Sequence, residues 1–122
     1  MAQLLRKLKR ALLDRDPSFC DMYEDARARR AAEEYLGHIR RHLAEAFGQQ
    51  RLTILDAGCQ AGRLLIPLAQ EGHRLIGVDT SGFALRRARR HLRQLRLDAT
   101  LHRGSISRLR SWVVAGSLDA VV

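Results

Sequence analysis

The chain has 122 residues and a formal net charge of +9 at pH 7, and 46% of its residues are hydrophobic. This length fits one modest domain, and this hydrophobic fraction supports a buried core, so extensive disorder is excluded. The positive charge favours anionic partners without naming one. Because no aromatic residues stand between the clustered arginines, we expect a solvated basic surface. A stripe that binds RNA or a membrane surface is the less favoured alternative.

Residues 1–50 are predicted to form an N-terminal helical segment. A first amphipathic helix covers residues 1–13, and its apolar runs are too short for a secretory signal or a membrane span. Asp16-Pro17-Ser18 breaks this helix, and a second, long helix then runs to about Phe47, with apolar residues at three- and four-residue steps. Gly37 is a candidate position for a kink or a break in this long helix. No membrane association is expected.

The cysteines and histidines are weak candidates for chemistry. Cys20 and Cys59 lack both C-x-x-C spacing and the paired pattern of a disulfide framework, so we expect a reducing, cytoplasmic compartment. A disulfide between them is the less favoured alternative. His38 and His42 have the i, i+4 spacing of a helical metal site, but the sequence implies no third ligand. We therefore expect no metal.

From residue 51 the pattern changes to short apolar runs that alternate with amphipathic helices. This alternation is typical of parallel strands buried on both faces of a sheet, so residues 51–122 are predicted to form an α/β domain. Pro67 should tighten or bend the second turn of the first helix of this domain, and Trp112 should pack the last helix against the sheet. Because the sequence stops within a strand, we expect it to be part of a longer protein. Strands are expected over residues 52–56, 74–79 and 99–103 and from 118 onward, with helices over 61–71, 81–95 and 107–113.

A glycine-rich turn follows the first predicted strand. Asp56 ends that strand, and Gly58 and Gly62 lie in the turn before the next helix. The second strand also ends on a carboxylate, Asp79. Glycines let a ligand approach the backbone, and the helix that follows points its N-terminus at the same place. The pattern therefore predicts a site for a nucleoside cofactor.

This order of strand, acid, glycines, helix, strand and acid resembles the class I S-adenosylmethionine-dependent methyltransferases, whose first motif reads like D-x-G-C-G-x-G. The resemblance covers about residues 52–122. It implies a Rossmann-like three-layer sandwich with parallel strands in the order 3-2-1-4, truncated after strand four and preceded by the N-terminal helices. It also implies S-adenosylmethionine as the cofactor, methyl transfer as the reaction and a small molecule as the methyl acceptor, whose identity the sequence does not give.

The resemblance also assigns roles to single residues. It implies that Asp56 helps to hold the amino group of the cofactor and that Asp79 accepts hydrogen bonds from both ribose hydroxyls. It also implies that Thr80 borders the adenine. Gln60 stands where the family commonly has its middle glycine, and Ser105 stands where it usually has an acid near the adenine. Catalytic residues are not identified. The cofactor-binding residues that it implies are Asp56, Ala57, Gly58, Cys59, Gly62, Asp79, Thr80, Ser105 and Ile106.

Two side chains near this site are expected to pack in the core. Cys59 is common at its place in the family, and a small buried side chain under the turn is favoured over a nucleophile, because no partner base is evident. Tyr35 lies on the long helix, and aromatic residues from a leading helix sometimes cover the pocket in this family. We nevertheless expect Tyr35 to be a core residue.

Two other functions are weighed against methyl transfer. One is a Rossmann oxidoreductase that binds NAD(P) or a flavin, but Asp56 would then lie near the pyrophosphate and repel it. The other is a non-catalytic basic module that binds RNA or a protein partner. In the implied strand order, strand four is an exposed edge, so an oligomer formed through that edge is also considered, and the chain alone is expected to aggregate or to be marginally stable.

Overall fold

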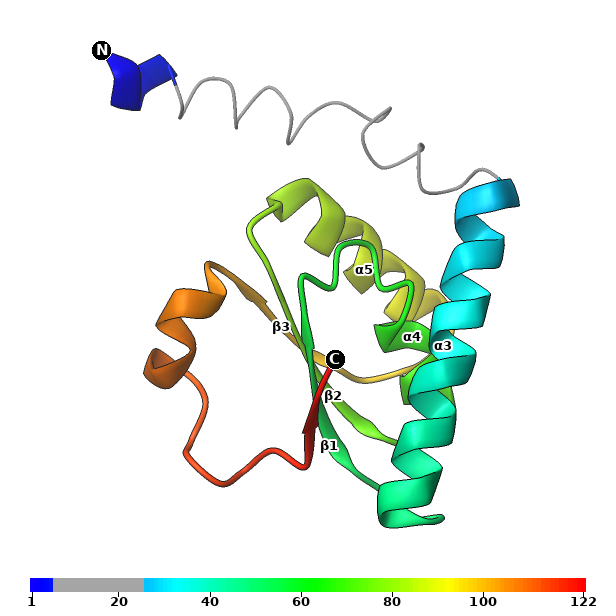
Figure 1. Cartoon of the computed structure of the whole chain (residues 1–122). Coiled ribbons are helices and arrows are strands. Elements are labelled where there is room, and N and C mark those ends of the chain that lie inside the picture. The colour runs from blue at the N-terminus through cyan, green and yellow to red at the C-terminus, as the bar shows by residue number, and fades with distance from the viewer. Residues whose placement is uncertain (6–25) are drawn as a thin grey trace.

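The computed structural model describes residues 1–5 and 26–122 (Figure 1). The predicted break at Asp16-Pro17-Ser18, most of the first predicted helix and Cys20 lie outside the described residues. The first long element is helix α3, Ala26–Phe47, a continuous helix of 22 residues that Gly37 does not split. Gly48 ends it in a left-handed conformation (φ +64°), and its N–H donates to the carbonyl oxygen of Ala44.

Four parallel strands form one sheet in the order β3-β2-β1-β4, which confirms the expected order. In the two central strands, which contain Leu55 and Ile76, these two residues lie opposite each other. Apolar side chains on both faces of β1 and β2 are fully buried, which explains why these strands read as continuous apolar runs in the sequence. The strands are β1 (Thr53–Ala57), β2 (Arg74–Asp79), β3 (Thr100–Arg103) and β4 (Ala120–Val121).

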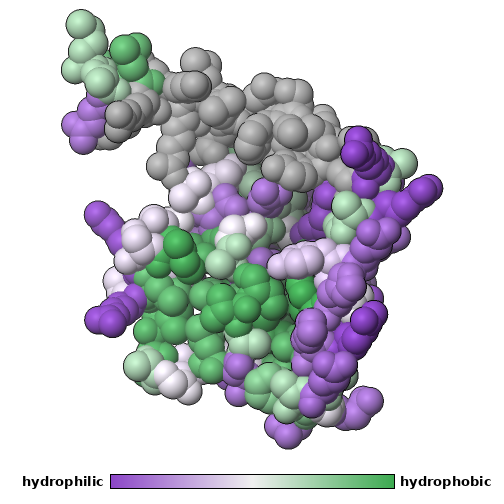
Figure 2. All heavy atoms as spheres, viewed as in Figure 1, coloured by the Kyte–Doolittle hydropathy of each residue, from purple (hydrophilic) through white to green (hydrophobic). Residues whose placement is uncertain are grey.

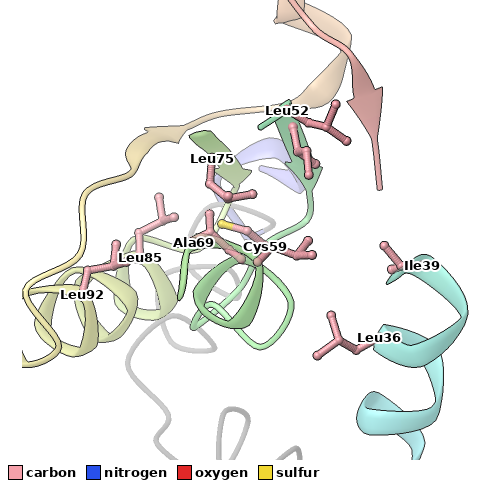
Figure 3. Close-up of a cluster of buried hydrophobic side chains, with 11 residues drawn as sticks. Leu36, Ile39, Leu52, Cys59, Ala69, Leu75, Leu85 and Leu92 are labelled. Carbon is pink, nitrogen blue, oxygen red and sulfur yellow. The ribbon is translucent and has the colours of Figure 1, made fainter. Parts of the chain in front are cut away.

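Helices α3, α4 (Leu65–Gln70) and α5 (Gly82–Gln94) cover one face of the sheet. Their apolar side chains meet those of the strands in a single buried cluster, part of which is drawn in Figure 3. This helical layer matters for function because it fixes α3 beside the end of β1. The buried members of the cluster are Leu36, Ile39, Leu52, Ile54, Cys59, Leu65, Leu68, Ala69, Leu75, Leu85 and Leu92.

The opposite face of the sheet carries a short 3-10 helix, η1 (Ile106–Ser111), close to the short helix that the sequence predicts over 107–113. Leu101 packs against the helical layer, so its neighbour His102 points to the other face. The indole ring of Trp112 stacks on His102, with ring centroids 4.4 Å apart. This contact attaches the segment that follows η1 to the sheet, as expected for Trp112.

The helix after the glycine turn begins later than predicted, at Leu65 instead of residue 61. Gln60 and Gly62 both have positive φ angles, +48° and +94°, which a right-handed helix cannot include. Pro67 is therefore the third residue of the helix and lies in the first turn. There its missing N–H leaves no intrahelical hydrogen bond unmade. Helix α5, in contrast, begins as expected, with the Ser81 hydroxyl accepting from the N–H of Ala84 at 3.1 Å.

Strand β4 lies at one edge of the sheet and is accompanied by exposed apolar side chains. Figure 2 shows hydrophobic residues gathered on the face that runs from η1 to the C-terminal strand. Val121 on β4 is 60% exposed and Val114 is 75% exposed. Among the described helices, none has the length and apolar character needed to cross a membrane. An exposed strand edge next to an apolar face favours association with other polypeptides.

We predict that Val121→Lys reduces self-association of the chain. A charged side chain on an edge strand opposes pairing with a second edge, because the charge would have to be desolvated. Size-exclusion chromatography with light scattering at increasing concentrations should show larger species for the unsubstituted chain than for this variant. Leu95→Lys is the matched control, since Leu95 is 48% exposed and lies just after α5. A monomeric unsubstituted chain, or an equal effect of both substitutions, would contradict the prediction.

Candidate functional site

The candidate site lies at the carboxyl ends of the parallel strands. Asp56 and Asp79 are at the ends of neighbouring strands, and the N–H of Gly104 donates to the carbonyl oxygen of Asp79 at 2.9 Å. This bond holds the end of β3 beside the end of β2. Parallel α/β sheets bind ligands outside these strand ends, where the loops converge. The loops after β1, β2 and β3 therefore share one edge of the domain.

The glycine turn after β1 is anchored to β2. The N–H groups of Gly58 and Cys59 both donate to the carbonyl oxygen of Val78, at 2.8 and 3.0 Å. The turn then closes on itself through the N–H of Gly62, which donates to the carbonyl oxygen of Cys59 at 2.9 Å. This path requires φ +77° at Gly58 and φ +94° at Gly62, which glycine adopts without steric cost.

The two glycines differ in what a side chain would meet. A Cβ atom on Gly62 would lie 2.8 Å from Cδ1 of Ile66, so the side chain of Ile66 on α4 would have to shift. A Cβ atom on Gly58 would meet no atom within 4 Å. The space beside Gly58 is open, as a ligand that approaches the backbone requires.

The carboxylate of Asp79 holds the loops on both sides of it. Its Oδ1 accepts from the N–H of Ser81 at 2.8 Å, and its Oδ2 accepts from the N–H of Gln60 at 3.0 Å. Gln60 makes this bond from a left-handed conformation (φ +48°), which explains why a glycine suits this position. Each carboxylate oxygen can accept a second hydrogen bond, so Asp79 can also receive ligand hydroxyls.

Asp56 is the only buried charged residue in the described part of the chain, with 3% of its surface exposed. The pKa of its carboxyl is raised from 3.8 to about 6: burial is the main cause, the backbone N–H of Leu65 opposes the shift, and the charge of Asp79 adds to it. Its Oδ2 has no hydrogen-bond partner. A buried oxygen without a partner is costly, so Asp56 is suited to receive a donor, and a cation above all.

A cavity of about 500 Å³ lies between α3 and the glycine turn. Asp56 and Gly58 line one side of it, and Tyr35 of α3 lines the other. Tyr35 is 55% exposed, so the expectation that it packs in the core is wrong. Helical spacing placed Tyr35 on the apolar face, but that face extends past the core to the cavity. The lining residues are Ala31, Ala32, Tyr35, Asp56, Gly58, Cys59, Gln60, Arg63 and Leu64.

Cys59 is buried among leucine side chains under the turn (Figure 3). Burial, followed by the charges of Asp56 and Asp79, raises the pKa of its thiol to about 12. The thiol is therefore protonated at neutral pH and is a poor nucleophile. Cys59 acts as a small packing residue that joins the turn to the core.

The remaining predicted site residues lie along the same edge but outside this cavity. Ala57 is the last residue of β1 and Thr80 directly follows β2, and both residues are exposed. The hydroxyl of Ser105 accepts from the N–H of Ser107 at 3.3 Å and so caps η1, and Ile106 is 48% exposed. The described residues contain no group of histidine, cysteine and acidic side chains that could hold a metal ion.

Comparison with known proteins assigns the family. A model of the methyltransferase domain family matches residues 54–122, which is more than half of the chain. The chain belongs to this family. The match begins in β1 and includes the glycine turn, Asp79 and the loop after β3, so the candidate site lies within the methyltransferase domain. No curated protein matches the sequence.

Solved methyltransferases share the fold of this methyltransferase domain. The magnesium protoporphyrin IX methyltransferase ChlM from Synechocystis PCC 6803, solved with bound S-adenosylmethionine, superposes with a TM-score of 0.71 at 20% identity, over 94% of this chain and 59% of that chain. WbdD, a bifunctional kinase-methyltransferase, superposes with a TM-score of 0.68 at 24% identity, over 83% of this chain and 23% of that chain. The chain thus spans about a quarter of WbdD and less than two thirds of ChlM.

We predict that Gly62→Ala destabilises the methyltransferase domain more than Gly58→Ala. Both substitutions place a Cβ atom on a residue with positive φ, which costs about 1–2 kcal/mol. Gly62→Ala also forces the side chain of Ile66 to move, for a total of about 3 kcal/mol. Urea unfolding should give a lower midpoint for Gly62→Ala at unchanged slope. Equal midpoints for the two variants would contradict this account of the turn.

We predict that the free energy of unfolding of the chain falls as the pH rises from about 4 to about 6, because the buried carboxyl of Asp56 loses its proton in this range. Its folded pKa of about 6 exceeds the ordinary value of 3.8, so the folded chain binds more protons in this window. The stability due to protonation is therefore fully present below pH 3.8 and is lost as the pH passes 6. The full change corresponds to about 3 kcal/mol.

Urea unfolding of the ligand-free chain and of Asp56→Asn at several pH values checks this. Asn keeps an acceptor for the N–H of Leu65 but does not titrate in this range. The stability of Asp56→Asn relative to the unsubstituted chain should increase across the window. Parallel pH profiles would show that the carboxyl is not desolvated in the folded chain.

Proposed function

We propose that this methyltransferase domain binds S-adenosylmethionine and takes part in the transfer of its methyl group to a small-molecule acceptor. The observation that carries the proposal is the buried, unpartnered Oδ2 of Asp56 in the wall of a cavity beside the glycine turn. A cationic amino group satisfies such an oxygen, and S-adenosylmethionine presents one on its methionine part. The family and the ligand-bound ChlM structure support the same cofactor.

The residues along the strand ends fit the successive parts of this cofactor. The methionine part would lie in the cavity, where the absent Cβ of Gly58 leaves space near Asp56. The ribose hydroxyls would donate to Asp79, and Thr80 would border the adenine. Ser105 and Ile106 would lie at the adenine end, beyond the bond that joins Gly104 to Asp79. Ala57, Cys59 and Gly62 would shape the turn that carries the cofactor.

The chemistry asked of the chain is mainly positioning. S-adenosylmethionine supplies a methyl group on a sulfonium, which is already an activated leaving group. The protein must hold this methyl group in line with the acceptor and exclude water from it. Asp56 and Asp79 would hold the cofactor at two points along its length, which sets the direction in which it lies across the strand ends. We also propose that the methyl acceptor is a small molecule. A reducing, cytoplasmic location is proposed as well, and it agrees with the free thiol of Cys59.

The same site disfavours a dinucleotide. In a Rossmann oxidoreductase the pyrophosphate lies against the glycine turn and the following helix. Asp56 lines the cavity at this turn, and its negative charge would repel the phosphates. Gln60 also occupies the place of the middle glycine of that fingerprint. A cationic ligand is therefore the better fit.

We predict that Asp79→Asn weakens binding of S-adenosylhomocysteine by about 100-fold, because two hydrogen bonds to a charged acceptor are lost or weakened. Isothermal titration calorimetry with the full chain measures this. Arg93→Gln, on the exposed side of α5, is the control and should bind normally. Melting temperatures recorded beside the titrations show whether Asp79→Asn still folds, since Asp79 also holds Gln60 and Ser81.

Each competing function gives its own outcome in this experiment. Binding of NADH without detectable binding of S-adenosylhomocysteine would overturn the proposal in favour of a dinucleotide enzyme. Binding of RNA that falls steeply with salt, without cofactor binding, would indicate a basic nucleic-acid module. A folded Asp79→Asn variant with unchanged cofactor affinity would show that Asp79 does not hold the ribose.

A further inference from the structure

The outward side of helix α5 is covered by arginines (Figure 1). From Thr80 to Leu97 the chain has six arginines and no acidic residue. The inward side of the helix is apolar, and Leu85, Ala88 and Leu92 on that side are between 0% and 4% exposed. The exposed arginines therefore point away from the core. We call them the arginine face of α5, and they are Arg86, Arg89, Arg90, Arg93 and, just beyond the helix, Arg96.

Helical spacing brings these positive charges close to one another. Arg86, Arg89 and Arg93 recur at steps of three and four residues, where Cβ atoms are about 5–6 Å apart and like charges destabilise a helix. Within the described chain, no residue of the arginine face forms an ion pair that would offset this repulsion. Arg86 lies over the ring of Phe83, 5.9 Å from its centroid, and this contact does not use its N–H donors. The free chain thus holds a row of uncompensated positive charge.

Arg96 adds a further exposed guanidinium at the end of the helix. It has φ +55°, the left-handed conformation that glycine usually supplies after the last turn. Its N–H donates to the carbonyl oxygen of Arg93 at 3.2 Å, and the N–H of Leu97 donates to that of Leu92 at 2.9 Å. This end of α5 also favours a cation through the helix dipole. The arginine face consequently extends along the whole outer side of α5.

The chemistry of this face favours a polyphosphate as its partner. Guanidinium groups donate to phosphate oxygens, and neutralising several phosphates at once releases condensed counterions. A membrane is a poorer partner, because the apolar side of α5 is buried in the core and cannot enter lipid. A protein interface has an apolar centre, which a row of arginines lacks. A single nucleic-acid strand needs exposed aromatic rings for stacking, and Phe83 is half-buried.

We infer that the arginine face of α5 docks on the phosphate backbone of double-stranded DNA without reading its sequence. The major groove of B-form DNA admits an α-helix, whereas that of A-form RNA is deep and narrow. Arg89 and Arg90 are consecutive residues and diverge by about 100° around the helix axis, so they point toward opposite walls of such a groove. No residue of α5 lines the cavity beside Asp56, so this surface is separate from the cofactor site and does not depend on the proposed function.

Fluorescence anisotropy with a labelled DNA duplex of mixed sequence tests the inference on the full chain. One variant replaces Arg89, Arg90 and Arg93 together with glutamine, and a second replaces the same three residues with lysine, which keeps the charge and still contacts phosphate. The same titrations use an RNA duplex of the same sequence, single-stranded DNA, and vesicles of phosphatidylserine and phosphatidylcholine. The matched control removes three exposed charges from α3 and carries Arg27→Gln, Arg29→Gln and Arg30→Gln.

We expect the unsubstituted chain to bind the DNA duplex with a Kd on the order of 10⁻⁵ M at physiological salt. The glutamine variant of α5 should bind about 100-fold more weakly at about 0.05 M salt. Its slope of log K against log salt should be shallower by nearly 3, since each lost phosphate contact removes about 0.9. The lysine variant and the α3 control should bind almost as the unsubstituted chain does. The glutamine variant should melt no lower than that chain, because like-charge repulsion has been removed.

Several outcomes would overturn the inference. An equal loss of affinity in the α3 control would show that binding follows net charge and not this face of the molecule. Tighter binding of the RNA duplex, the single strand or the vesicles than of the DNA duplex would assign the face another partner. Loss of binding in the lysine variant, or no binding of DNA by the unsubstituted chain, would also contradict it. If the triple glutamine variant does not fold, Arg93→Gln alone should make the salt slope shallower by about 0.9, and an unchanged slope would count against the inference.

Discussion

The carbonyl oxygen of Val78 is the acceptor on which the site depends. It receives the N–H groups of Gly58 and Cys59, and these two bonds fix the start of the turn after β1 against the end of β2. They can form only if the backbone turns sharply at Gly58, which has φ +77°. The position of this glycine turn also determines where α4 begins. The wall of the cavity at Gly58 and the packing of Cys59 follow from this attachment, whereas Asp56 is placed by the pairing of β1 with β2.

The carboxylate of Asp79 completes the attachment from the side chain. By accepting from Gln60 and Ser81, it links the glycine turn to the start of α5. Asp79 is thus a structural residue before any ligand binds, and a ligand that donates to it adds to bonds that already orient its oxygens. Such preorganisation lowers the entropy cost of binding, because the acceptor atoms do not have to be ordered when the ligand arrives.

Local patterns in the sequence predict the strands and α5 well, because each is defined by its own residues. The apolar runs identify β1 and β2, and the hydroxyl of Ser81 marks the first turn of α5. The start of α4 was predicted too early, since the left-handed conformation of Gln60 is imposed by its bond to Asp79, a residue of another strand. Helical periodicity also does not distinguish a core residue from one that lines a cavity, so it predicts a core position for Tyr35, which lines the cavity instead.

Some residues of the candidate site are likewise predicted by a local sequence pattern, and others are not. The order of acids and glycines in the sequence locates Asp56, Gly58 and Asp79, since the strand ends of a parallel sheet meet at one edge. Ala31, Ala32 and Arg63 carry no such signal. Ala31 and Ala32 reach the cavity only because α3 packs beside the end of β1, and a contact between distant segments has no local pattern. The N-terminal helix thus belongs to the site as well as to the core.

The two carboxylates at the strand ends differ in a way that gives the site a direction. Asp79 already accepts two backbone N–H groups, so its charge is well solvated by the protein and suits neutral hydroxyl donors. Asp56 is buried with one oxygen unpartnered, so its charge is costly and favours a cation. A ligand with a cationic end and a hydroxyl-bearing middle therefore has one preferred orientation, with the cation over β1 and the hydroxyls over β2. Under the proposed function, this places the methionine part beside α3 and the adenine toward β3. The reversed orientation would leave the charge of Asp56 without a cation.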